Sequence, residues 1–134
     1  MINQLYSVTP TKTRQVQFPN TITVAGTPLL LGSLPCTNLD SFQDTIGGAT
    51  CYFDGAFSFP VVAASSISPF VGKAINPGDP IYALGGVLDP TTNVTSGFTL
   101  CADSGGVLFG TLNSQADPIG SGETDDAAGV DINL

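Results

Sequence analysis

Histidine and tryptophan are absent from this chain, and lysine and arginine together number only three among its 134 residues. Without an imidazole, a serine or cysteine nucleophile lacks its usual proton acceptor, and metal sites built on histidine are excluded. Eleven acidic residues against three basic ones give a formal net charge of −8. This balance excludes nucleic-acid binding through a basic patch and docking on an anionic membrane surface.

Long hydrophobic runs are also missing. No apolar run approaches the ~18 residues of a transmembrane helix, and no apolar signal-peptide core follows the first residues, so we expect folding in a cytoplasm. Charged residues make up 10% of the chain, against about 25% in an average protein. A surface with so little charge is typical of a protein that lies against other proteins.

The cysteines number three, Cys36, Cys51 and Cys101, and none forms a CxxC pair. An odd number with these spacings argues against a disulfide framework. We expect small buried hydrophobic residues, although one disulfide plus one free thiol stays open.

The stretch from residue 55 to residue 86 predicts the centre of the fold. Phe57, Phe59 and Val61 alternate with smaller or polar residues, which is the period of a strand with one buried face. Residues 76–80, Asn-Pro-Gly-Asp-Pro, predict a turn, because proline fixes φ and glycine supplies a positive φ. Residues 81–83 then predict the next short strand.

Similar short strands are expected along the rest of the chain, separated by glycine and proline. The expected strands are residues 21–24, 29–31, 49–53, 57–62, 81–83, 87–88, 98–101, 107–112 and 130–134. Asp54-Gly55 predicts a hairpin joining residues 49–53 to 57–62. Residues 33–48 are expected to form a polar connection. The pattern predicts an all-β fold, a compact β-barrel or β-sandwich of about eight to ten short strands.

The first nineteen residues predict an extended N-terminal arm, and residues 20–134 a single β domain. Pro10 and Pro19 interrupt the arm's short β-prone pieces, and an extended arm could reach roughly 60 Å. The alternative is a first strand that packs on its own domain. The arm residues expected to bind a neighbouring subunit or partner are Leu5, Tyr6, Lys12, Arg14, Val16 and Phe18.

Two groups of residues resemble catalytic or metal sites. The segment Asp103-Ser104-Gly105-Gly106 is similar to the nucleophile segment of chymotrypsin-like serine proteases, but Lys73 is the sole candidate base outside the arm. We expect a turn capped by Asp103 and Ser104, with its glycines at positive φ, and no enzyme activity. The second group is an acidic cluster, Glu123, Asp125, Asp126 and Asp131. We expect these residues to lie in a solvated loop. The alternative is a weak calcium-binding site.

Six segments, in their order and spacing, resemble the phage capsid cement (head decoration) proteins of the DUF2190 family. They are residues 25–32 (AGTPLLLG), 53–60 (FDGAFSFP), 75–82 (INPGDPIY), 107–110 (VLFG), 120–123 (GSGE) and 130–134 (VDINL). The likeness runs from about residue 24 to residue 134. It departs from the family pattern at Leu34-Pro35-Cys36, which puts the strand register between residues 32 and 49 in doubt.

The resemblance implies a β-barrel or β-sandwich that binds the outer surface of a phage head, without catalysis and without a cofactor. The implied partners are the major capsid protein and the protein itself, as a homotrimer first and a dimer second. The implied location is the outside of the virion, after synthesis in the host cytoplasm. The alternative from another class is a carbohydrate- or receptor-binding β-module, for which Tyr52 and Tyr82 are the candidate exposed aromatic residues.

Overall fold

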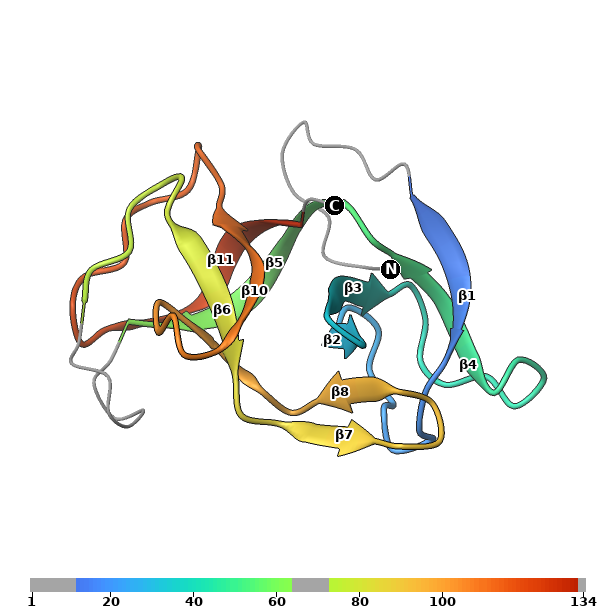
Figure 1. The fold of residues 1–134 in the computed structure, drawn as a ribbon. Helices are drawn as coiled ribbons and strands as arrows, with labels where there is room; N and C mark the ends of the chain where they lie inside the picture. Colours follow the sequence, from blue (N-terminus) through green and yellow to red (C-terminus); the bar gives the residue numbers. More distant parts are fainter. Residues whose placement is uncertain (1–11, 64–72, 133–134) are drawn as a thin grey trace.

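A computed structural model describes residues 12–63 and 73–132 of the chain (Figure 1). Within these ranges the fold is all-β, which confirms the predicted class, and no helix is long and apolar enough to cross a membrane. The strands are β1 Thr13–Gln17, β2 Pro28–Leu31, β3 Leu34–Asn38, β4 Gly48–Tyr52, β5 Gly55–Val62, β6 Pro80–Leu84, β7 Val87–Asp89, β8 Val94–Ser96, β9 Thr99–Cys101, β10 Val107–Leu112 and β11 Thr124–Ile132.

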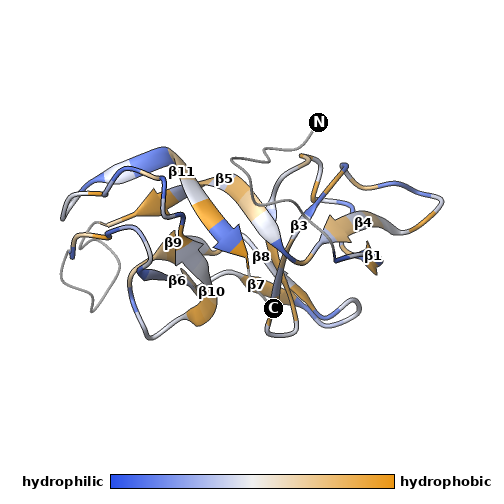
Figure 2. Cartoon of the chain, turned by 90° about the horizontal axis from the view of Figure 1, so that it is seen from above, coloured by the Kyte–Doolittle hydropathy of each residue, from blue (hydrophilic) through white to orange (hydrophobic). Residues whose placement is uncertain are grey.

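The strands form an open sheet and a closed barrel. The six-stranded sheet has the order β1-β4-β3-β2-β8-β7, and the barrel has the order β10-β11-β5-β9-β6. Figures 1 and 2 place the barrel strands at one end of the molecule and β1 and β4 at the other. All neighbouring strands are antiparallel except β5 and β9, which pair in parallel at Val62 and Cys101. The fold therefore contains one of the two predicted architectures, a closed barrel, together with an open six-stranded sheet.

The chain passes between the sheet and the barrel three times, from β4 to β5, from β6 to β7 and from β8 to β9. Glycine permits all three passages, because Gly55 has φ 111°, Gly86 has φ 89° and Gly97 has φ 72°. A Cβ atom at Gly86 would also lie 2.8 Å from the backbone oxygen of Ser96. The passages tie the sheet and the barrel together, so neither is made from one continuous segment.

The longest strand pair, β5 with β11, crosses the barrel. Pro60 lies within β5 although it has no N–H to donate. The register accommodates it, since β11 bulges between Asp125 and Ala128 at the position opposite Pro60. The expected last strand began at residue 130, but β11 begins at Thr124, so part of the expected acidic loop is a strand.

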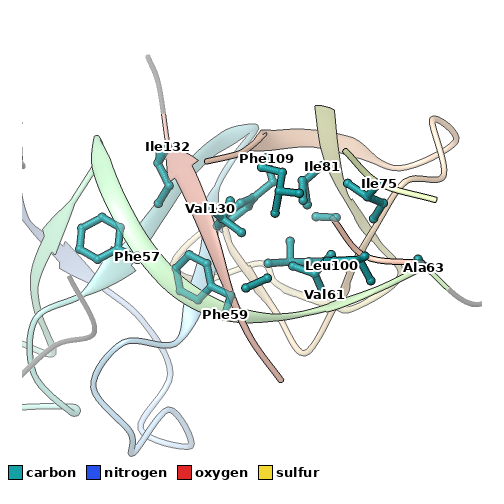
Figure 3. Packing of buried hydrophobic residues seen from close by; sticks show 14 of the residues in the cluster. Phe57, Phe59, Val61, Ala63, Ile75, Ile81, Leu100, Phe109, Val130 and Ile132 are labelled. Atoms are coloured by element: carbon teal, nitrogen blue, oxygen red, sulfur yellow. The ribbon is translucent and has the colours of Figure 1, made fainter. Parts of the chain in front are cut away.

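Two hydrophobic cores lie under the strands. The barrel core takes the alternating residues of β5, and Phe59 packs edge-on against Phe109 with ring centroids 5.7 Å apart. Figure 3 shows Val61 and Leu100 pointing into the same interior. The second core lies on the six-stranded sheet and consists of Val16, Phe18, Ile22, Leu29, Cys36, Ala49, Cys51, Phe53 and Val94. The predicted buried face at Phe57, Phe59 and Val61 is confirmed.

The hairpin predicted at Asp54-Gly55 is wrong. β4 pairs with β1 and β3, whereas β5 pairs with β11 and β9. The two residues carry the chain out of the sheet and into the barrel instead. The strand expected at residues 98–101 is β9, which pairs with β6 and β5 of the barrel.

The polar connection expected at residues 33–48 contains a strand. β3 pairs with β2 through four residue pairs and with β4 through two. Residues 21–24, expected as a strand, are irregular, and Asn38 holds the end of this segment in place. The buried Asn38 amide donates to the backbone oxygen atoms of Val24 and Asp40, both at 2.9 Å, and accepts from the N–H of Thr27 at 2.7 Å.

The boundary expected after residue 19 is also corrected. β1 forms five residue pairs with β4, from Thr13 opposite Tyr52 to Gln17 opposite Gly48. Val16 and Phe18 are buried in the core of the sheet. Residues 12–19 are therefore part of the domain, as in the alternative considered for the arm, because their apolar side chains are needed to complete that core. Residues 1–11 lie outside the described residues.

Candidate interaction surfaces

A shallow apolar groove lies between the β2–β3 turn and β10. Its volume is about 370 Å³, and it is lined by Ser33, Leu34, Pro35, Val107, Leu108, Phe109, Gly110 and Thr111. The exposed fractions are 40% for Leu34, 42% for Val107 and 55% for Leu108. Three large hydrophobic side chains thus share one open surface, and none of the described lining residues is charged. We call this surface the β10 groove.

Local backbone geometry explains why these side chains are exposed. The N–H of Gly32 donates to the backbone oxygen of Asn93 at 2.8 Å, and the φ of Gly32 is 61°, so β2 turns sharply into β3 and Leu34 is the first residue of β3. On the other side of the groove, the register of β10 against β6 shifts between Leu108 and Gly110. That bulge breaks the alternation of buried and exposed positions. Val107 and Leu108 are therefore both exposed, and Phe109 and Gly110 are both buried.

A second apolar surface lies on β7, which is a terminal strand of the six-stranded sheet (Figure 1). Val87 is 74% exposed and Leu88 is 53% exposed. β7 pairs with β8 on one side and has no partner on the other among the described strands. We call this surface the β7 edge. An unpaired strand edge with exposed apolar side chains is a template for pairing with another chain.

The acidic residues nearest in sequence to these surfaces are engaged in local turns. Asp89, which ends β7, accepts hydrogen bonds from the N–H and the hydroxyl of Thr92 at 3.2 and 2.6 Å. Asp103, which precedes β10, accepts from the N–H of Gly105 at 2.9 Å. Both carboxylates therefore stabilise turns beside the apolar surfaces.

The residues predicted to bind a partner through the arm differ in their exposure. Leu5 and Tyr6 lie outside the described residues. Val16 and Phe18 are buried in their own domain, so the expectation that they contact a neighbour is wrong. The two cationic residues of the set, Lys12 and Arg14, are exposed on or beside β1.

Arg14 contacts an aromatic ring on the sheet. Its guanidinium lies over the ring of Phe53, 5.7 Å from the ring centroid. A guanidinium held over an aromatic face is a cation–π pair that orients the charge. This pair thus fixes the position of the Arg14 guanidinium on the sheet.

The protease-like segment forms the expected turn. The N–H groups of Gly105 and Gly106 donate to the side-chain and backbone oxygen atoms of Asp103. The glycines do not take the positive φ expected of them. Ser104 and Lys73 line one depression of about 150 Å³ that Tyr82 also borders, but the two make no hydrogen bond with each other. Nothing in this geometry activates the serine.

The acidic cluster near the end of the chain is spread along β11. Asp125 accepts from the N–H of Ala127 at 3.0 Å, and Asp131 accepts from the side-chain amide of Asn113 at 2.7 Å. Within the described residues, no three acidic, cysteine or histidine side chains gather in a way that could hold a metal ion.

The three cysteines are free and buried, as predicted. Cys36 and Cys51 lie on the adjacent strands β3 and β4 within the sheet core. A hydrogen bond with the Cys51 side chain, followed by desolvation, raises the pKa of the Cys36 thiol well above its ordinary value. A thiol held in this way is protonated and unreactive at neutral pH.

The two tyrosines considered as a glycan platform are half-buried. Tyr52 stacks on Phe57, with ring centroids 5.8 Å apart and an interplanar angle of 18°. Its ring therefore packs against the barrel core. Tyr82 borders a small polar depression beside Lys73. Among the described residues, these tyrosines do not form one exposed aromatic surface.

Sequence reasoning missed both apolar surfaces. Val87-Leu88 and Val107-Leu108 were each assigned to strands, and their apolar side chains suggested burial. A strand with one buried face alternates, so two successive large apolar residues carry a signal that one of them faces outward. That signal was present at both places. The contribution of Leu34 to the groove could not be predicted, because β3, which begins at Leu34, was expected to be part of a polar connection.

Comparisons of the chain with protein-family models, with curated proteins and with solved structures give no match.

Proposed function

We propose that this chain is a capsid cement protein, which binds the outer surface of a phage head as an oligomer and clamps adjacent major capsid protein subunits. The observation that carries the proposal is the character of the described surface. It presents uncharged apolar residues on the β10 groove and the β7 edge. Exposed apolar surfaces of this kind are typical of proteins that bind other proteins.

The segments that resemble the cement family support the same proposal through the fold. The turn at Asn76 is closed by the Asp79 side chain, which accepts from the Asn76 N–H at 2.9 Å. The N–H of Gly78 and the backbone oxygen of Asp79 then bond to Leu112 in β10, at 2.8 and 2.9 Å. This resembling segment therefore fastens β6 to β10 and shapes the barrel. At this segment, the residues that resemble the cement family are residues that build the fold of the domain.

A rigid barrel with many backbone pairings suits a clamp. Cement binding must resist outward pressure on the shell without local unfolding, so most of the binding energy should come from apolar contact and multivalency. Arg14 and Lys12 would pair with acidic groups of the capsid and set the orientation. Leu5 and Tyr6 remain candidates for additional contact. Val16 and Phe18 take no part, because they are buried in the domain.

A head-stability assay tests the proposal. Expanded heads that lack cement are heated with and without the purified protein, and disruption is followed by light scattering. An unrelated acidic protein of similar net charge serves as the control. We expect the disruption temperature to rise with this protein and not with the control. Unchanged disruption temperatures at saturating protein would overturn the proposal, and binding on a glycan array would then favour the receptor-binding alternative.

A further inference from the structure

Two of the three buried thiols lie on adjacent strands and share one core. Cys51 in β4 stands opposite Asn38 in β3, and Cys36 lies two residues before Asn38 on the same strand. Opposite residues share a face of a sheet, and so do residues two apart along a strand. Cys36 and Cys51 therefore point into the same core, the core of the six-stranded sheet, where both are fully buried.

The two side chains are in contact. The Cys36 thiol hydrogen-bonds the Cys51 side chain, and the Cys51 sulfur also lies 3.8 Å from the backbone oxygen of Ala49. Diagonal neighbours in an antiparallel pair lie about 7 Å apart, which is at the upper end of the range that a disulfide bridges. A bond between these two sulfur atoms therefore needs only a small approach of β3 to β4. Cys101 lies on β9 of the barrel, outside this core.

The two cysteines lie where the pairing of β3 with β4 ends. β3 is joined to β4 by two residue pairs, whereas β1 is joined to β4 by five. Beyond the pair of Thr37 with Tyr52, the N–H of Phe53 donates to the backbone oxygen of Lys12 and not to β3. A covalent link at this place would therefore strengthen the shorter of the two pairings that β4 makes.

We propose that Cys36 and Cys51 form a disulfide when the protein meets a small-molecule disulfide such as oxidised glutathione, and that this bond holds β3 on β4 while Cys101 stays free. One protein thiolate attacks the small disulfide, which gives a mixed disulfide and releases one small thiol. The second protein thiolate then attacks the protein sulfur of the mixed disulfide and releases the second small thiol. Two protons and two electrons pass from the protein to the small disulfide. This inference goes beyond the proposed cement function and does not depend on it.

Burial determines how fast this reaction proceeds. The thiolate is the attacking species, but in the closed fold the Cys36 thiol keeps its proton and neither sulfur is exposed to solvent. Oxidation therefore proceeds from molecules in which this part of the sheet is transiently open. The disulfide then closes a loop of about 15 residues and restricts the unfolded chain. The protein thus folds with free thiols and acquires the cross-link slowly in oxidising surroundings.

Oxidation of the purified wild type tests the pairing. The protein is incubated with oxidised glutathione, in buffer and in urea below the unfolding transition, and the remaining thiols are alkylated in denaturant. The intact mass is measured, followed by a non-reducing digest with a protease that cleaves at aspartate. Cleavage at Asp40 and Asp44 separates Cys36 from Cys51 unless a disulfide joins them. The variant Cys101→Ala keeps the pair and is the matched control for Cys36→Ala and Cys51→Ala, which remove it.

We expect the oxidised wild type to lose the mass of two hydrogen atoms and to yield one linked peptide pair, which contains Cys36 and Cys51, while Cys101 is alkylated. The reaction should be faster in urea than in buffer. Oxidation should raise the thermal midpoint of the wild type and of Cys101→Ala by about 5–10 °C, and dithiothreitol should reverse the rise. Cys36→Ala and Cys51→Ala should show no rise. The reduced wild type is its own reference, so the test stands even where a variant does not fold.

Three results would overturn the proposal. The first is a wild type whose three thiols all remain open to alkylation after oxidation in urea. The second is a linked peptide that contains Cys101. The third is a cross-linked protein whose thermal midpoint is unchanged or lower. None of these measurements involves a phage head, so failure of this inference is distinguishable from failure of the cement function.

Discussion

The backbone N–H of Lys12 donates a 2.8 Å hydrogen bond to Oδ1 of Asp54, the residue at which the chain leaves the sheet for the barrel. The N–H of Phe53 in turn donates to the backbone oxygen of Lys12 at 2.8 Å. These two bonds fasten the beginning of β1 to the passage between β4 and β5. The domain therefore begins at or before Lys12.

Two truncations test this boundary. A chain that begins at Lys12 keeps all of β1 and should unfold cooperatively, like the full chain. A chain that begins at residue 20 loses β1 together with Val16 and Phe18. Loss of these two buried side chains should lower the free energy of unfolding by about 3–6 kcal/mol. Urea denaturation measures both. Equal stability of the two truncated chains would restore the boundary predicted from the sequence.

Point variants on β1 give the same test without a truncation. Val16→Ala removes a buried side chain from the sheet core and should lower the free energy of unfolding by about 1–3 kcal/mol. Gln15→Ala changes the adjacent exposed residue and should stay within about 0.5 kcal/mol of the wild type. Equal effects at the two positions would contradict the packing of β1 on its own domain.

We expect Asn38 to be the polar residue whose substitution destabilises the sheet most. Asn38→Ala removes three hydrogen bonds from a fully buried position. At roughly 1 kcal/mol per bond, with an added penalty for buried backbone groups left unpaired, we expect a loss of about 3–5 kcal/mol. Asn20→Ala is the exposed control and should be nearly neutral. A loss at Asn38 no larger than at Asn20 would show that water replaces these bonds.

The Cys36 thiol predicts how stability changes at alkaline pH. Its pKa is raised in the folded chain, whereas the unfolded thiol titrates near the ordinary value of 9.0. Above pH 9.0 the unfolded state loses this proton first, so it binds fewer protons and stability falls as pH rises. The contribution is fully present below that pH. One thiol accounts for about 1.4 kcal/mol per pH unit until the folded pKa is reached.

The variant Cys36→Ala should flatten this alkaline decline relative to the wild type, whatever its stability at neutral pH. Urea denaturation between pH 8 and pH 10 measures the two slopes. All other side chains are the same in both proteins, so the difference between the slopes isolates the Cys36 thiol. An unchanged slope would mean that the thiol does not keep its proton in the folded state.

Local signals in the sequence were sufficient where the structure is decided locally. The turn at residues 76–79 closes through Asp79 as its residue types predict. The alternation at Phe57, Phe59 and Val61 matches the buried face of β5. These features depend on φ preferences and on a period of two, both of which are visible in a few neighbouring residues.

Pairing partners could not be predicted in the same way. Asp54-Gly55 bends the chain, but a bend does not determine whether the next strand returns to the same sheet or enters another. β5 enters the barrel because its partners are β11 and β9, both far away in the sequence. β3 was not predicted for another reason, since Pro35 and Asn38 have low strand preference and yet are buried in it.

The sequence alone identifies only part of the candidate surfaces. Successive apolar residues mark β7 and the start of β10, and they could have been recognised as exposed. The groove itself combines residues 33–35 with residues 107–111, which the fold brings together across more than half of the chain. Such a surface follows from topology, so the sequence alone could not locate it.

Cement function is tested most directly by co-sedimentation of the purified protein with undecorated, expanded heads of the phage that encodes it, with bound copies counted per shell. Our account predicts saturation at a number of copies fixed by the local symmetry axes of the shell, which is three copies per threefold axis for a homotrimer. A protein that stays in the supernatant at every concentration, while folded, would contradict the account.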